Sequence, residues 1–322
     1  MANRGAIWDP QVHTISDLKE LGCRKLPKMY RDYFNEGAMD LVTLRDNEEA
    51  YNRYKIIPRI LVNVDNVDMS SSVFGIRTSF PVGFSPAAMH KLAHPDGELG
   101  VSRAAAKMKI CMALSSYATE SLENVAAEGK GNPYAMQLCV LRDRPTTIQI
   151  LERAEDDMAW PNLLSNGRSE LSGKASEGAG TSSHDFDPSL DWDTAIPWLR
   201  KHTKLQLWLK GVYMPEDVAL AIRHGLDGVI VSNHGGRQLD GAPATLDALR
   251  ICAPVAAGKI PIAVDGGIRR GTDIFKAIAL GASHCFVGRI PIWGLAYKGQ
   301  DGVELALKIL MYEFKIAMSL AG

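Results

Sequence analysis

The 322-residue chain lacks the long apolar runs, the charge excess and the cysteine pattern that mark several classes of protein. No hydrophobic stretch approaches the roughly 20 residues that span a bilayer, so we expect no membrane segment. The 36 basic and 37 acidic residues leave a net charge of −1, which provides no basic surface for nucleic acid. The five cysteines show no metal-site spacing, so no metal ligands are expected and a reduced intracellular compartment is the simplest interpretation.

Targeting signals are also missing from the sequence. The first residues, MANRGAIWDPQVHT, contain no apolar signal-peptide core, and the final MSLAG differs from a peroxisomal Ser-Lys-Leu address. We therefore expect a cytoplasmic protein.

From residue 80 onward, short aliphatic runs alternate with helical stretches, which is typical of parallel βα units. Strands are expected at 81–87, 110–116, 133–140, 205–211, 228–233, 260–267 and 284–289. Helices are expected at 96–108, 119–128, 145–155, 192–202, 215–224, 245–257, 272–280 and 301–320, after a helical region over 14–60. This order predicts an α/β fold, a TIM (β/α)8 barrel, whose active site lies at the carboxyl ends of the strands.

Only seven strands are apparent, because the helical stretches at 145–155 and 192–202 follow each other with no strand between them. The intervening segment, 156–191, is polar and rich in glycine and serine, and it is expected to be a mobile loop. The sequence therefore predicts a single domain over 1–322 built on an incomplete barrel, with one βα strand absent. Such a barrel would expose two unpaired strand edges.

Two glycine-rich strand ends resemble phosphate-binding loops. DGGIRRGTD (265–273) opens a helix, and GASHCFVGRIPIW (281–293) ends a strand at a glycine and an arginine. In barrels, the last two strand-to-helix loops commonly bind phosphate through backbone amides. The alternative is that the glycines are turn residues and the arginines are solvated. Lys210 ends an expected strand, and it either extends into solvent or stabilises negative charge on a phosphorylated cofactor.

The stretch VIVSNHGGRQLD (229–240) places a histidine and an arginine where a strand leaves the core. His234 is a candidate general base, and Arg237 can hold a carboxylate through two parallel hydrogen bonds. The alternative makes His234 a capped loop residue and Arg237 a surface charge.

Together these motifs resemble the FMN-dependent 2-hydroxy-acid oxidases and dehydrogenases, a family that includes glycolate oxidase, lactate oxidase and the flavin domain of flavocytochrome lactate dehydrogenase. The resemblance covers nearly the whole chain. It is carried by KLPKMYRDYFNEGAMD (25–40), PAAMHKLAHPDGE (86–98), LSSYAT (114–119), VSNHGGRQLDGAPAT (231–245) and DGGIRRGTD. SNHGGRQLDG in one piece, followed by both phosphate loops, is highly specific.

The resemblance implies FMN-dependent oxidation of an (S)-2-hydroxy acid, such as lactate or glycolate, to a 2-oxo acid. Dioxygen or another carrier would accept the electrons, and the protein would be a homotetramer. His234 would be the catalytic base, and Tyr33 and Arg237 would bind the substrate carboxylate. Lys210 would lie near the flavin's pyrimidine edge. The other cofactor-binding residues implied are Pro86, Ala87, Ala88, Ser115, Gln137, Ser232, Asp265, Gly267, Arg269, Gly288 and Arg289.

The sequence departs from the family pattern at two places in the expected site. Cys139 stands where the family usually has tyrosine. The family's fourth strand carries an aspartate that pairs with the catalytic histidine, and an arginine beyond it, but neither follows LERAE (151–155). A base without its orienting carboxylate loses stabilisation of its cationic form, so we expect impaired activity. The alternatives are a catalytically inactive flavin-binding protein and a phosphate-binding barrel enzyme without flavin.

Overall fold

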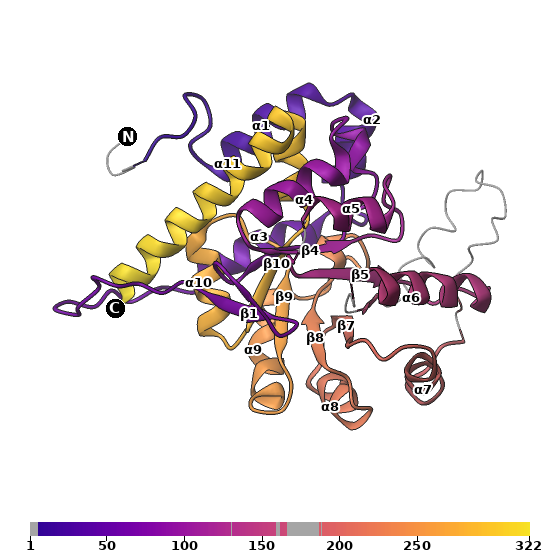
Figure 1. Ribbon diagram of the computed structural model, residues 1–322. Helices are drawn as coiled ribbons and strands as arrows, with labels where there is room; N and C mark the ends of the chain where they lie inside the picture. The colour runs from indigo at the N-terminus through magenta and orange to yellow at the C-terminus, as the bar shows by residue number, and fades with distance from the viewer. Residues whose placement is uncertain (1–5, 130, 159–161, 166–186, 188) are drawn as a thin grey trace.

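Eight parallel strands form a closed barrel at the centre of the molecule in the computed structural model, which describes residues 6–129, 131–158, 162–165, 187 and 189–322 (Figure 1). Around the barrel the strand order is β10-β3-β4-β5-β6-β7-β8-β9. Their bounds are β3 (Val82–Phe84), β4 (Cys111–Leu114), β5 (Tyr134–Leu138), β6 (Asn162–Ser165), β7 (Leu207–Val212), β8 (Gly228–Val231), β9 (Ile262–Asp265) and β10 (His284–Val287). The predicted TIM barrel is therefore confirmed.

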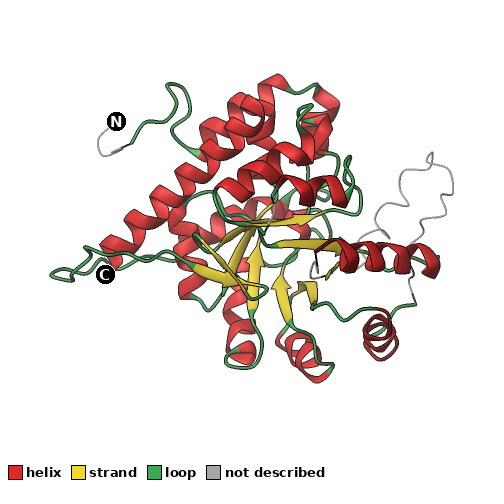
Figure 2. Ribbon diagram, in the orientation of Figure 1, coloured by secondary structure: helices red, strands yellow, loops and turns green. Residues whose placement is uncertain are grey.

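Helices follow the strands and cover the outside of the barrel (Figure 2). They are α4 (Gly97–Lys107), α5 (Leu122–Glu128), α6 (Arg144–Met158), α7 (Trp192–His202), α8 (Pro215–Arg223), α9 (Thr245–Ala256), α10 (Gly271–Ala279) and α11 (Arg289–Ala321). Local sequence fixes several of their starts: Ser121 and Asp191 cap α5 and α7 by accepting hydrogen bonds from the N–H groups of Asn124 and Thr194.

The prediction that one strand is absent was wrong. β6 pairs with β5 through Met136 and Asn162, and with β7 through Leu164 and Leu209, so none of the eight described barrel strands has a free edge. Residues 156–158 of the expected mobile loop are the end of α6, while 159–161, 166–186 and 188 lie outside the described residues. The strand NLLS was missed because it lies in a segment that is otherwise polar and rich in glycine and serine, whereas the other barrel strands lie in longer aliphatic runs.

A hairpin of β1 (Ser71–Val73) and β2 (Ile76–Thr78) closes the amino-terminal end of the barrel. The ring of Phe74, at its turn, packs edge-on against Trp208, with 5.0 Å between the ring centroids, and also contacts Phe286. Small buried residues fill the rest of this layer: Cys111, Ala113, Ala135 and Ala263. The lower half of the barrel is therefore a packed core, which leaves the carboxyl ends of the strands for a site.

Three helices precede the barrel, as the sequence predicted for residues 14–60: α1 (Ile15–Lys25), α2 (Lys28–Asn35) and α3 (Val42–Arg53). Helix α1 lies along α11, the long C-terminal helix (Figure 1). Helix α11 is interrupted by non-helical backbone at Lys298 and Gly299, so its second part matches the helix expected at 301–320. Within the described part of the chain, no helix combines the length and apolar character needed to cross a membrane.

Candidate active site

A cavity of about 270 Å³ opens at the carboxyl ends of the strands, and most residues predicted for the site line it. The predicted residues on its wall are Tyr33, Pro86, Ala87, Ala88, Ser115, Gln137, Lys210, His234, Arg237, Asp265, Gly267, Arg269, Gly288 and Arg289. Ser232 is not on the wall, but it is buried beside it and accepts a hydrogen bond from Lys210. The barrel therefore gathers into one place residues that are more than 250 positions apart in the sequence.

Lys210 carries a positive charge into the base of the cavity. It lies within β7 and its side chain is only 5% exposed, so the alternative in which it extends into solvent is wrong. Its Nζ donates to Ser232 Oγ at 2.8 Å and lies 3.0 Å from Asp265 Oδ2. Ser85 also donates to Asp265 Oδ2, at 2.9 Å. Because both partners are buried, this ion pair fixes the position of the ammonium group, which a solvent-exposed ion pair would not do.

His234 lies on the cavity wall, three residues beyond the end of β8. Its backbone is left-handed, with φ of 56°, and its N–H donates to Ser232 Oγ at 3.0 Å. Loss of solvation, Lys210, Arg237 and Arg289 lower its pKa, while Asp265 opposes them. The imidazole ring is exposed to the cavity, so water there reduces the effect of desolvation on the pKa of His234. The neighbouring charges shift this pKa whether or not water is present. The ring is therefore neutral near pH 7, the state required of a base.

Arg237 lies across the cavity mouth, tied to α2 and the segment after it. Its Nη1 donates to the backbone oxygens of Tyr33, at 2.7 Å, and Glu36, at 3.2 Å. Its guanidinium also stacks over the Tyr33 ring, 5.3 Å from the centroid. The alternative of a free surface charge is therefore wrong for this residue, because backbone and ring together orient its remaining N–H groups.

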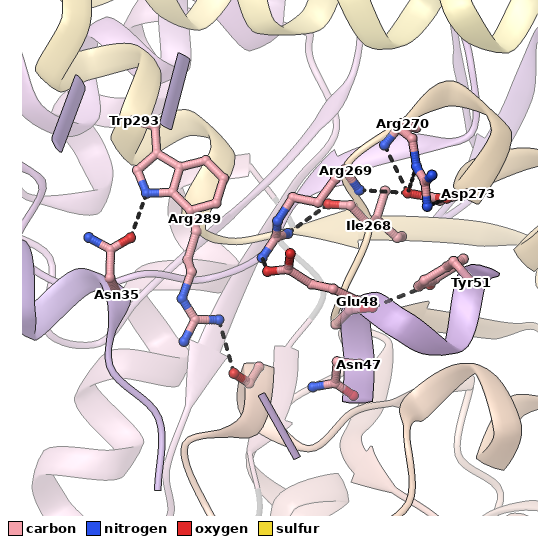
Figure 3. Close-up of polar contacts among 12 residues, drawn as sticks. Asn35, Asn47, Glu48, Tyr51, Ile268, Arg269, Arg270, Asp273, Arg289 and Trp293 are labelled. Atoms are coloured by element: carbon pink, nitrogen blue, oxygen red, sulfur yellow. Dashed lines mark hydrogen bonds and ion pairs between the residues drawn. The ribbon is translucent and has the colours of Figure 1, made fainter. Parts of the chain in front are cut away.

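Arg289 and Arg269 also line the cavity, and Figure 3 shows their polar contacts. Arg289 lies beside Arg237, because both donate to the carbonyl oxygen of Glu36. Arg289 donates to backbone oxygens of Phe34, Gly235 and Glu36 at 2.9–3.0 Å. Burial, followed by the charges of Arg269 and Arg237, lowers the pKa of Arg289 to about 9. A low arginine pKa means that these cations repel one another and that an anion between them would be stabilised.

Arg269 is oriented by contacts on three sides. Its Nη2 donates to Glu48 Oε1 at 2.8 Å, its Nη1 to the carbonyl of Ile268 at 2.7 Å, and its guanidinium stacks on Trp293 (Figure 3). Trp293 is itself fixed by the hydrogen bond from its Nε1 to Asn35 Oδ1, at 2.9 Å. Arg269 Nε is buried and has no hydrogen-bond partner among the described residues.

Gln137, Ser115 and Cys139 form the polar wall at the ends of β4 and β5. Gln137 Oε1 accepts from the Ser116 N–H at 3.1 Å and from Ser115 Oγ at 3.4 Å. Gln137 Nε2 donates to Cys139 Sγ at 3.1 Å. The thiol is thus on the cavity wall, at the position where the sequence analysis noted a departure from the expected tyrosine.

The donors and charges of this cavity fit FMN. Asp265 Oδ1 is buried and, among the described residues, accepts no hydrogen bond, so it is available to a hydroxyl such as those of a ribityl chain. Arg269 Nε and the crowded charge of Arg289 favour a dianionic phosphate beside Gly267 and Gly288, which both line the cavity. Lys210 provides a buried positive charge at the base of the same cavity.

The predicted set omitted several residues of the cavity wall: Phe34, Ser85, Tyr117, Gly235, Gly266, Ile268, Phe286, Val287 and Ile292. Some adjoin predicted residues, and Tyr117 lies inside the quoted LSSYAT motif, so a rule covering whole strand-end loops would have found them. Phe34 and Ile292 come from α2 and α11, the helices that also carry the predicted Tyr33 and Arg289, and both lie inside motifs quoted in the sequence analysis.

Comparison with known proteins shows which family this chain resembles over nearly its whole length. A family model described as FMN-dependent dehydrogenase matches residues 23–160 and 157–322. Oxidase FUB9 of Gibberella fujikuroi is 47% identical over 326 residues, covering 97% of this chain and 91% of that protein. Human 2-hydroxyacid oxidase 1 is 40% identical over 347 residues, covering 97% and 94%. A mandelate oxidase variant solved with (S)-mandelic acid superposes with a TM-score of 0.89 at 34% identity, covering 97% of this chain and 95% of the other.

Proposed function

The chain belongs to the FMN-dependent dehydrogenase family, and from this membership we propose that it oxidises an (S)-2-hydroxy acid to the corresponding 2-oxo acid. The observation that carries the proposal is one cavity that contains His234, Arg237 and Lys210 together with both glycine–arginine loops. Relatives named as hydroxy-acid oxidases, and a mandelate oxidase solved with (S)-mandelic acid, support the substrate class.

The proposed substrate lies between Arg237, Tyr33 and His234. Arg237 and the Tyr33 hydroxyl bind its carboxylate, because a guanidinium can donate two parallel N–H groups to it. His234 takes one proton from the substrate, and its neutral state near pH 7 makes the imidazole ready to accept. FMN, when bound, would supply the redox chemistry as the acceptor of the two electrons and the second proton.

The protein's part in cofactor binding divides by chemistry. Arg269, Arg289, Gly267 and Gly288 are proposed to hold the phosphate, and Asp265 the ribityl chain. Lys210, oriented by Ser232, is proposed to stabilise negative charge on the ring. The remaining residues proposed to line the ring are Pro86, Ala87, Ala88, Ser115 and Gln137.

A catalytically inactive flavin-binding protein remains the second candidate, and one observation favours it. Within the described ranges, no carboxylate accepts a hydrogen bond from the His234 ring, so the aspartate that the family pattern places beside the base has no substitute in direct contact. The two unpaired strand edges expected of an incomplete barrel are not found, because the eight described barrel strands form a closed ring. A phosphate-binding barrel enzyme without flavin is disfavoured by the family membership.

An absorption spectrum before and after substrate separates these functions. We expect purified protein to be yellow and to bleach when lactate, glycolate or mandelate is added without oxygen. The control is His234→Gln, which should stay yellow and bleach at least about 100-fold more slowly because it lacks the base. A yellow wild-type protein that none of these acids bleaches would favour the inactive flavoprotein, and colourless folded protein would contradict both.

The single domain over 1–322, the homotetramer, the electron acceptor and the cytoplasmic location are further proposals. Sedimentation of the purified protein tests the oligomer, and oxygen consumption tests dioxygen as the acceptor. Imaging of a tagged full-length chain tests the location, and the comparison matters because one plant relative is named a peroxisomal oxidase.

A further inference from the structure

The turn that carries His234 has an unusual backbone that other residues must maintain. His234, Gly235 and Gly236 have successive φ values of 56°, 64° and 76°. Glycine adopts the left-handed region freely, but a histidine does so at a cost in free energy. A residue held in such a conformation persists only where the surrounding structure fixes it.

The side chain of Asn233 supplies part of that support. Its Oδ1 accepts a hydrogen bond from the Gly236 N–H at 3.0 Å, which closes the turn over His234. Its Nδ2 donates to the hydroxyl of Tyr213 at 3.0 Å. Asn233 is only 7% exposed, so these bonds are formed away from competing water.

Asn233 is joined to helix α3 by a reciprocal pair of amide hydrogen bonds with Asn47. Asn47 Nδ2 donates to Asn233 Oδ1 at 2.9 Å, and Asn233 Nδ2 donates to Asn47 Oδ1 at 2.8 Å. Asn47 is 1% exposed, and its Oδ1 also accepts from the N–H of Thr245, at the start of α9. Removal of either amide would leave a buried partner unsatisfied.

The same turn of α3 also contacts the proposed phosphate loop. The Asn47 carbonyl lies so close to Gly267 that a Cβ there would be 1.9 Å from it. Glu48, the next residue, bonds Arg269, and Figure 3 shows Asn47 beside Glu48 on this helix. One turn of α3 therefore contacts both the histidine turn and the phosphate loop.

We propose that Asn47 and Asn233 are positioning residues, whose reciprocal amide pair holds the left-handed turn of His234 in register with the phosphate loop. The pair acts through His234 and touches neither substrate nor cofactor. The inference rests on the proposed function only for the role of His234 as base; the geometric claim can be tested without activity.

The first test follows the imidazole itself. Protein with ¹³C-labelled histidine is titrated by NMR without FMN, and His234→Gln identifies the signal. In Asn47→Ala and Asn233→Ala we expect the His234 pKa to rise by about one unit, because the ring becomes better solvated and moves away from Lys210, Arg237 and Arg289, whose combined effect exceeds that of Asp265. The matched control is Asn52→Ala, which removes an exposed asparagine on the same helix that bonds Arg270 instead. That control should leave the titration unchanged.

The second test measures substrate-dependent bleaching of the FMN-loaded protein without oxygen. Misplacing the base should slow bleaching by about 100-fold in each alanine variant, with little change in the substrate concentration at half-maximal rate. The double variant should be no slower than the slower single variant, since both residues act through one pair. Asn52→Ala should bleach at the wild-type rate.

The outcomes separate the two levels of the proposal. If wild-type protein does not bleach, the proposed function fails, and the NMR titration still decides the positioning role. An unchanged His234 titration in both alanine variants overturns the positioning role even if the enzyme is active. Should an alanine variant aggregate, Asn233→Ser keeps an acceptor for the Gly236 N–H but is too short to reach Asn47, and it must give the same shift.

Discussion

Removing His284, a histidine that the proposed mechanism does not use, should protect the protein against acid. His284 begins β10 and is 0% exposed. Burial lowers its pKa to about 3, and a contact with the Val82 backbone only partly offsets this. In the unfolded chain its pKa returns to about 6.5. Between pH 6.5 and pH 3 the unfolded state therefore binds a proton at His284, whereas the folded state does not.

The sign and size of the effect follow from this difference. The contribution of His284 to the free energy of unfolding is fully present above pH 6.5, and it is lost by about 1.4 kcal/mol per pH unit as the pH falls towards 3. Between pH 7 and pH 4.5 the loss due to His284 amounts to about 2.5 kcal/mol, a large part of a stability of roughly 5–15 kcal/mol. His284→Leu, which has a similar volume, should abolish this part of the loss.

The assay is urea unfolding of the FMN-loaded protein at pH 7 and pH 4.5, at one fixed FMN concentration. The wild-type protein should lose about 2.5 kcal/mol more than His284→Leu over this interval. Other groups that titrate there, such as buried His90, are common to both proteins and cancel in the difference. Equal losses in the two proteins would mean that His284 is protonated or hydrated in the folded state, and the reasoning would be refuted.

Three further substitutions test the site. Arg237→Lys keeps the positive charge but loses the paired N–H groups, so kcat/KM for the 2-hydroxy acid should fall about 10- to 100-fold. The flavin spectrum should be retained. An unchanged kcat/KM would argue against carboxylate binding by Arg237. Lys210→Met leaves the buried Asp265 carboxylate without its ion-pair partner and should lower the free energy of unfolding, measured in urea, by about 3–5 kcal/mol. A decrease near zero would show that the pair is hydrated. Gly131→Ala should lower the free energy of unfolding by about 1–2 kcal/mol, because its φ of 78° is left-handed. Gly267→Ala should lower it clearly more, because φ there is nearly the same, 79°, but only Gly267 faces the Asn47 carbonyl. Equal costs would contradict the close packing of α3.

The barrel was predictable because most of its strands are apolar runs followed by recognisable helices. Two elements of the fold were not predictable from the sequence. β6 lies in a segment rich in polar residues, glycine and serine, and its place depends on pairing with β5 and β7, which lie elsewhere in the sequence. The β1–β2 hairpin turns at Phe74 and Gly75, both with positive φ, and only its packing against Trp208 reveals its role. In both cases the deciding interactions are non-local, so periodicity within the segment carries little information.

The site was predictable where the barrel rule applies and unpredictable where other elements meet it. Asp265 ends β9, Gly288 follows β10 directly and His234 lies three residues beyond the end of β8, so the strand ends alone place them together. The orientation of Arg237 and Arg289 depends instead on backbone carbonyls from α2 and the segment after it. Backbone carbonyls are present at every residue and leave no mark in the sequence, so these contacts could only come from the structure.

The charges around His234 bear on how the proposed base works without a carboxylate partner. Lys210, Arg237 and Arg289 all disfavour the imidazolium, and Asp265 is the anion that opposes them. A substrate carboxylate bound to Arg237, and a phosphate beside Arg289, would offset two of these three cations. The pKa of His234 should therefore rise when the cavity is filled by its ligands, which is when a base must accept a proton. Ligand binding would thus supply part of the stabilisation that the expected aspartate would otherwise provide.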